Sequence, residues 1–295
     1  MIDYKLKINN EINRKQHKVR HYLFVFSALL IMFFLLTACS RGSAGSSSST
    51  FIIAGSTSVQ PYVEILVEEY VVLHPDKLID VQGGGSSAGI QAVESHTAEI
   101  GMSSRNLKDT EKDLWSIEIT KDALAIIINP GNPVNSLTLE EIRGIYAADY
   151  DNWSQLGGPD ARIHVIAREE GSGTRSAFEE LVMDERRITP RAIVQDSNGS
   201  VRQLVSDDPF SIGFISLGLV DVGERPVKAL RINDAAPTKN NVLNGDYALY
   251  RSFLFVALEK PSGNVMEFID FIRSPDGQRI MSDEGLIPEF GVHDD

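Results

Sequence analysis

The chain has 295 residues, with 28 Lys or Arg against 41 Asp or Glu, a net charge of −13 and a single cysteine. Nucleic-acid recognition needs a basic face, so this composition predicts no nucleic-acid partner. A lone cysteine has no disulfide partner within the chain and needs another explanation.

The first 38 residues have the pattern of a secretory signal peptide. Six Lys or Arg residues lie between Lys5 and Arg20, and an apolar run follows over residues 23–36. Cys39 comes directly after Leu-Thr-Ala, which resembles a bacterial lipobox, in which the cysteine is acylated. We therefore expect an extracytoplasmic protein anchored to the cell membrane through a lipid on Cys39. An uncleaved signal anchor is the alternative.

Residues 39–50 are rich in Gly and Ser and predict a flexible tether that buries no core. The first 38 residues carry six Lys or Arg and two Asp or Glu, so the rest of the chain has a net charge of −17. Net charge describes solubility and association rather than a local site. Residues 51–295 are long enough for two modest lobes.

Short apolar strands and amphipathic helices alternate along this part of the chain. Such alternation predicts an α/β fold with largely parallel sheets. Ser136 or Thr138 can cap the third helix. The expected strands are residues 51–54, 78–82, 99–103, 122–129, 162–167, 212–215 and 253–258. The expected helices are residues 62–73, 90–94, 137–146, 174–182, 201–205, 265–273 and 275–283.

Three Gly/Ser turns connect a predicted strand to a predicted helix, over residues 54–58, 83–89 and 171–174. The first N–H groups of a helix lack internal partners and carry partial positive charge. Glycine lets the backbone approach a ligand, and Ser or Thr adds hydroxyl donors. Together the three turns predict a binding site for an anion.

The same residues leave an enzyme open as an alternative. Ser87 fits the G-x-S-x-G pattern of serine hydrolases, with His96, His164 or His293 as the possible base. A dinucleotide pattern at residues 83–88 lacks its acidic residue. The His and carboxylate spacings predict no metal site, and we expect no cofactor.

Four segments, AGSTSVQP, GGGSSAGI, IGMSSR and REEGSGTR, follow one another in an order that resembles the ligand loops of the phosphate-binding proteins of bacterial ABC transporters. The resemblance covers the whole body of the chain. It implies a type II periplasmic-binding-protein fold, in which two α/β lobes joined by two hinge crossovers close on a ligand. Lobe 1 is then residues 51–122 and 252–295, and lobe 2 is residues 123–251.

The resemblance also implies the residues of the site. Arg168 is expected to make the charged contact and Glu170 to hold its guanidinium, with Glu169 a solvated neighbour. The implied ligand-binding residues are Thr57, Ser58, Ser86, Ser104, Arg105, Arg168, Glu170, Ser172, Gly173 and Thr174.

Two of these positions leave the role open. Ser104 stands where many members of the family have an Asp that accepts a proton from the ligand, so the selectivity for phosphate over sulfate is expected to be weaker. Arg105 either adds positive charge to the site or pairs with an acid of its own lobe.

These observations predict a monomeric receptor that captures inorganic phosphate, passes it to an ABC permease and performs no bond chemistry. The alternatives are a receptor for another tetrahedral oxyanion such as sulfate or arsenate, a secreted hydrolase using Ser87, and a surface protein that keeps the fold with a decayed site.

Overall fold

The computed structural model describes residues 49–223 and 226–288. The predicted signal peptide, Cys39 and His293 lie outside these residues. The predicted tether extends too far at its C-terminal end, because Ser49 and Thr50 pair with Lys77 and Leu78 in the first strand pair. Backbone pairing with a neighbouring strand therefore decides the start of the fold, which composition alone cannot reveal.

Lobe 1 is built on three parallel strands, with β1 between β2 and β3. Helix α2 lies on them because Val63, Leu66 and Tyr70 recur at helical spacing and are buried. The elements of lobe 1 are β1 (Ser49–Gly55), α2 (Gln60–Leu73), β2 (Lys77–Gly83), α3 (Ser86–Glu94), β3 (Ile100–Ser103), η1 (Asp109–Glu111), α8 (Gly263–Arg273) and α9 (Pro275–Asp283).

Lobe 2 is built on β6, which pairs in parallel with both β7 and β8. Thr138, one of the two predicted caps, begins α4 by accepting a hydrogen bond from the Glu141 N–H. The elements of lobe 2 are β5 (Ser136–Leu137), α4 (Leu139–Tyr146), η2 (Trp153–Leu156), β6 (His164–Arg168), α5 (Gly173–Phe178), η3 (Glu179–Met183), β7 (Ile193–Gln195), α6 (Asn198–Asp207), β8 (Ser211–Ser216), η4 (Leu217–Leu219), β9 (Lys228–Ala229), β10 (Arg231–Ile232) and α7 (Lys239–Leu243).

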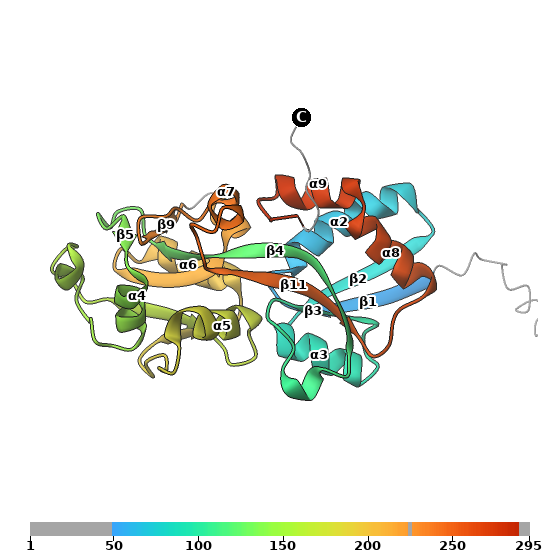
Figure 1. Ribbon diagram of the computed structural model, residues 1–295, viewed down its shortest axis with the longest axis horizontal. Coiled ribbons are helices and arrows are strands. Elements are labelled where there is room, and N and C mark those ends of the chain that lie inside the picture. Colours follow the sequence, from blue (N-terminus) through green and yellow to red (C-terminus); the bar gives the residue numbers. More distant parts are fainter. Residues whose placement is uncertain (1–48, 224–225, 289–295) are drawn as a thin grey trace, which may run out of the picture. The chain divides into compact units, whose positions relative to one another are not determined.

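Two long strands connect the lobes. β4 (Trp115–Ile128) and β11 (Tyr250–Ala257) run antiparallel, side by side (Figure 1). The first half of β4 pairs with β11 and its second half with β8, so the sheet order is β2-β1-β3-β11-β4-β8-β6-β7. The mixed α/β architecture and the two crossovers agree with the predicted fold class, whereas the residue limits of the two lobes stay a prediction.

Each lobe has its own hydrophobic centre. In lobe 1 the cluster includes Ile53, Leu66 and Phe255, and helices α2, α8 and α9 contribute to it. In lobe 2 apolar residues pack on both faces of the sheet, around Phe214 on one face and Ile215 on the other. Separate cores joined by two strands are the construction that permits a hinge.

Within the described residues, no helix combines the length and the apolar character that crossing a membrane requires.

Candidate functional site

The candidate site lies where the parallel strands of each lobe end. In open α/β sheets, ligands bind in the crevice outside the carboxyl ends of the strands. In lobe 1 these ends are Gly55, Gly83 and Ser103, and in lobe 2 they include Arg168 and Ser216. Most of the predicted site residues follow one of these five positions within a few residues.

Five buried hydroxyl groups, called here the hydroxyl cluster, meet across the two lobes: Ser56, Ser58, Ser86, Ser104 and Thr174, each 2% exposed or less. The Ser56 hydroxyl donates to Ser104 Oγ at 2.9 Å, and the Ser104 N–H donates to Ser86 Oγ at 3.0 Å. Ser58 Oγ lies 3.1 Å from Thr174 Oγ1, so the cluster bridges the lobes.

The serines at the starts of α2 and α3 contribute to the hydroxyl cluster and do not cap their helices. Helices α2 and α3 begin without a side-chain cap, whereas Ser172 caps α5 by accepting from the Arg175 N–H at 3.2 Å. Serine is among the preferred capping residues, so its diversion at α2 and α3 frees hydroxyl groups for another partner.

Gly173 sets how closely the lobes meet. A Cβ atom at this position would lie 2.1 Å from Ser86 Oγ and 2.5 Å from Ser104 Oγ. The backbone of lobe 2 therefore lies directly against two hydroxyl groups of lobe 1, and only glycine permits this approach.

Arg168 is the charged group of the site. It is 1% exposed, and its Nη2 donates to Thr57 Oγ1 at 3.2 Å and to the Asp196 carbonyl at 3.0 Å. Its Nη1 is buried and has no hydrogen-bond partner among residues 49–223 and 226–288. A buried guanidinium nitrogen without a partner is costly, so Arg168 is poised to receive an anion.

The expected partner of Arg168 is wrong. Glu169, not Glu170, holds the guanidinium, with hydrogen bonds of 2.9 Å from both Nε and Nη2 to its carboxylate. Residues 168 and 170 would lie on the same side only in an extended segment. Instead β6 ends at Arg168 and the chain turns, with the Ser172 N–H donating to the Glu169 carbonyl at 3.1 Å.

Glu170 lies on the surface. It is exposed and borders an open pocket together with Arg175, Arg186 and Arg187. Glu170 is therefore not assigned to the site, because it is exposed and the residues that border this pocket do not belong to the hydroxyl cluster.

Arg105 takes one of its two predicted roles. It is buried and forms a two-pronged ion pair with Glu111 of its own lobe, at 2.7 and 2.9 Å. The hydrogen bonds from Arg105 hold the pKa of Glu111 below its usual value. Arg105 therefore pairs with an acid of its own lobe, the second of the two roles expected from the sequence.

The hydrolase alternative finds no support in the contacts of Ser87. Its hydroxyl accepts a long hydrogen bond of 3.4 Å from Arg105. His164 lies in lobe 2 and pairs with Asp208 at 2.6 Å, and His96 is exposed. In the described part of the chain no histidine forms a hydrogen bond with Ser87, and no group of three or more His, Cys, Asp or Glu could hold a metal ion.

Sequence reasoning missed two residues of the site, Ser56 and Glu169. Both signals were present in the sequence, since Ser56 begins the run Ser-Thr-Ser and Glu169 follows Arg168 directly. The sequence does not reveal where the chain turns after β6, nor that the hydroxyl group of Ser56 is one that contacts Ser104.

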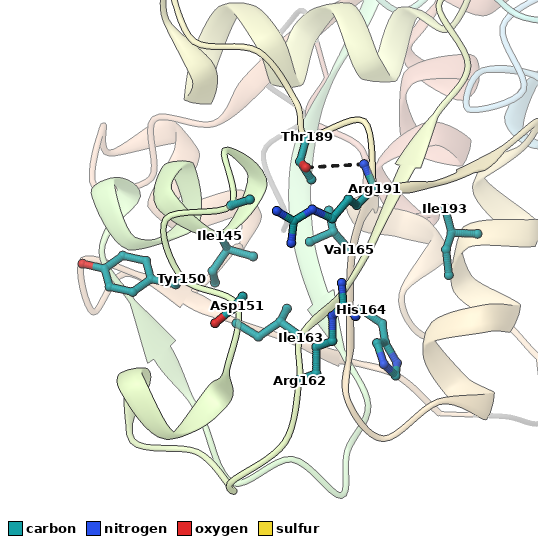
Figure 2. Close-up of a pocket in the computed structure, with 11 residues that line it drawn as sticks. Ile145, Tyr150, Asp151, Arg162, Ile163, His164, Val165, Thr189, Arg191 and Ile193 are labelled. Atoms are coloured by element: carbon teal, nitrogen blue, oxygen red, sulfur yellow. Dashed lines mark hydrogen bonds between the residues drawn. The ribbon is translucent and has the colours of Figure 1, made fainter.

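A separate cavity lies in lobe 2 (Figure 2). Its lining combines apolar side chains such as Ile145 and Val165 with Arg162, His164 and Arg191. None of the predicted ligand-binding residues lines it, so it plays no part in the candidate site.

Comparison with known proteins identifies the group to which this architecture belongs. Residues 42–276 match the family model described as PBP superfamily domain. The chain is 30% identical over 271 residues to phosphate-binding protein PstS of Borreliella burgdorferi, covering 88% of this chain and 97% of that protein. It is 29% identical to PstS of Bacillus subtilis, with 88% and 92% covered.

Solved structures agree with the curated relatives. A Clostridium perfringens structure described as a phosphate ABC transporter substrate-binding protein with bound phosphate is 39% identical, has a TM-score of 0.78, and is matched over 82% of this chain and 100% of that one. An ABC-type phosphate transport receptor from Vibrio cholerae is 37% identical with a TM-score of 0.66, over 80% and 99%. The two-lobed fold predicted from the sequence is thereby confirmed. The chain belongs to the PBP superfamily and, within it, to the family of the phosphate-binding protein PstS.

Proposed function

We propose that this protein is an extracytoplasmic receptor that captures inorganic phosphate and delivers it to the permease of an ABC transporter. The observation that carries the proposal is the buried Nη1 of Arg168, which has no partner within the described residues and belongs to the same guanidinium that contacts Thr57. A tetrahedral oxyanion supplies acceptor oxygens for such a group.

The chemistry of the surrounding residues suits phosphate. Each hydroxyl group of the cluster can donate a hydrogen bond to an anion or accept one from a protonated oxygen of the ligand. The planar guanidinium of Arg168 presents paired N–H donors whose geometry matches phosphate oxygens. The acidic net charge does not oppose this, because the donors are local and buried.

Ligand capture requires both lobes. Ser58, Ser86 and Ser104 come from lobe 1, whereas Arg168 and Thr174 come from lobe 2. A ligand held by donors from both lobes favours the closed state, and β4 and β11 provide the hinge. We assign residues 51–122 and 252–295 to lobe 1 and residues 123–251 to lobe 2.

We assign the ligand contacts to Thr57, Ser58, Ser86, Ser104, Arg168, Gly173 and Thr174. Glu169 holds Arg168 in place, and Ser172 orders the turn that carries Gly173. We further propose that the protein acts as a monomer, performs no bond chemistry, and is anchored by a lipid on Cys39.

Equilibrium dialysis of the full chain in detergent with radiolabelled phosphate tests this function. We expect one phosphate bound per chain, displaced by arsenate and less effectively by sulfate at the same concentration. Absence of phosphate binding would refute the proposal. A stronger displacement by sulfate than by unlabelled phosphate would favour the alternative receptor for another oxyanion.

A further inference from the structure

A second orphaned donor lies near Arg168, on Asn198. Strands β6, β7 and β8 are parallel, so their carboxyl ends lie at one edge of the sheet. Asn198 follows the end of β7 and begins α6, two residues after Asp196, whose carbonyl receives Arg168 Nη2 at 3.0 Å. Asn198 and Arg168 therefore belong to the same edge, where ligands of such sheets bind.

The side chain of Asn198 is buried and only half satisfied. It is 1% exposed, and its Oδ1 accepts a hydrogen bond from the Ser216 N–H at 3.3 Å. Because a backbone N–H can only donate, this contact fixes which end of the amide is oxygen. Its Nδ2 has no partner in the described residues, as is also true of Arg168 Nη1.

Helix capping does not explain Asn198. Ser197 caps α6, its hydroxyl accepting from the Ser200 N–H at 3.1 Å. The Asn198 amide is therefore not used to cap the helix, the common role of a polar residue at a helix start. An unsatisfied buried amide donor destabilises a protein unless something binds it.

We propose that Asn198 is a further ligand-binding residue, whose Nδ2 donates to a phosphate oxygen beside Arg168 Nη1. The inference rests on the proposed function. An amide NH₂ group donates and cannot accept a hydrogen bond, so it favours an unprotonated phosphate oxygen, which is the better acceptor, over the P–OH group, which needs an acceptor for its proton. Asn198 therefore orients hydrogen phosphate, directing its protonated oxygen toward the hydroxyl cluster.

The position of Asn198 also links the ligand to the hinge. Ser216, which binds Asn198 Oδ1 through its N–H, donates its hydroxyl to Asp122 of β4 at 2.7 Å. The same hydroxyl lies 3.1 Å from the Tyr62 hydroxyl of lobe 1. A ligand bound by Asn198 would therefore be connected through Ser216 to Asp122 of β4 and to Tyr62 of lobe 1.

The substitution Asn198→Asp separates a ligand role from a structural one. Aspartate keeps an oxygen to accept from Ser216 but replaces the donor with an anionic acceptor. If Asn198 only accepts from Ser216, this variant should keep near wild-type phosphate affinity even where the buried charge lowers its stability, whereas a ligand-binding Asn198 should lose affinity. We expect phosphate affinity to fall at least about tenfold, the loss typical of a missing hydrogen bond to a charged group.

The chain offers a matched control in Asn132→Asp. Asn132 is 2% exposed, its Oδ1 accepts from the Val134 N–H at 3.1 Å, and its Nδ2 also lacks a partner among the residues described. Asn132 follows the end of β4, where Ile128 pairs with Ile212 near the start of β8. Asn198 instead contacts Ser216 at the other end of β8, so Asn132 lies away from the edge of the sheet that carries the candidate site. Its substitution should leave phosphate affinity unchanged.

Calorimetric titration with inorganic phosphate of the full chain in detergent compares wild type, Asn198→Asp and Asn132→Asp, with circular dichroism to check folding. Weakened binding in Asn198→Asp alone supports the inference, and wild-type affinity in that variant overturns it. If that variant does not fold, Asn198→Ala replaces it under the same criterion. A wild-type chain that binds no phosphate would instead refute the proposed function, and the inference with it.

Discussion

The guanidinium of Arg168 donates from Nε and Nη2 to the Glu169 carboxylate, and its buried Nη1 has no partner among the described residues. The carboxylate fixes the orientation of the guanidinium and offsets the cost of burying its charge. We propose that the remaining nitrogen donates to the ligand. The two roles of Arg168 explain why an anion site contains a carboxylate.

We expect Glu169→Gln to lower the free energy of unfolding of the ligand-free protein by about 1.5–3 kcal/mol, the contribution of a hydrogen bond to a charged group. The loss arises because Arg168 would remain buried without its counter-ion. Glu170→Gln is the matched control and should leave the stability unchanged. Urea denaturation measures both, and equal effects of the two substitutions would contradict the assigned pairing.

We propose that Ser104 faces the proton of the bound phosphate. We expect Ser104→Asp to raise the ratio of phosphate to sulfate affinity by about tenfold or more, because a carboxylate accepts the phosphate proton and repels sulfate. Ser95→Asp, in the same lobe but exposed, is the control. Competition binding at pH 6 and pH 8 gives the ratio. An unchanged ratio in Ser104→Asp would show that Ser104 does not contact the ligand.

The identity of these residues was predictable but their pairing was not. The sequence marks Arg168 and the Ser/Thr turns by type and order. Which carboxylate reaches Arg168 depends on the residue at which β6 stops, and a shift of one position exchanges Glu169 for Glu170.

Between the lobes, strands β4 and β11 carry a buried ion pair. Asp122 and Arg251 lie opposite each other in the register, and Arg251 Nη2 donates to Asp122 Oδ2 at 3.0 Å. Burial raises the pKa of Asp122, while Arg251 and the Ser216 hydroxyl counteract the rise. The pair places two opposite charges on the two strands that join the lobes.

Asp122→Asn should destabilise the protein by about 3–5 kcal/mol, because it leaves the Arg251 guanidinium buried without a counter-ion. The double substitution Asp122→Asn with Arg251→Met should recover part of this loss. Asp276→Asn, which breaks an exposed pair with Arg279, should have a much smaller effect. Urea denaturation measures all three. A loss in Asp122→Asn no larger than that in Asp276→Asn would contradict the role of the buried pair.

Most helices and strands could be predicted from apolar periodicity, with ends shifted by a few residues. The first half of β4 was missed, because residues 115–121 mix charged and apolar side chains. The predicted helix 174–182 divides into α5 and the wider turn η3. Short strands such as β7, stabilised mainly by pairing with β6, leave little signal in the sequence.

For the molecule as a whole, sequence order was the strongest evidence for the fold. The four ligand loops follow one another along the chain, yet Ser58, Ser86, Ser104 and Thr174 meet in one hydroxyl cluster. The short distance between the Gly173 backbone and Ser86 depends on how the two lobes pack together, which the sequence does not reveal.

At this scale the proposed membrane anchor is tested through Cys39. We expect Cys39→Ser to abolish labelling by a fatty-acid probe and to leave the protein unprocessed or in the soluble fraction. Normal processing and membrane retention of this variant would contradict the lipid anchor. Phosphate binding by the variant should be unaffected, since residue 39 lies outside the part of the chain that forms the site.

The central claim is that Arg168 and the hydroxyl cluster hold phosphate between the lobes. Calorimetric titration of the full chain with phosphate, comparing wild type with Arg168→Ala and the exposed control Arg279→Ala, tests it most directly. We predict one site in the wild type, at least about tenfold weaker binding in Arg168→Ala, and no change in the control. Wild-type affinity in Arg168→Ala would contradict the account.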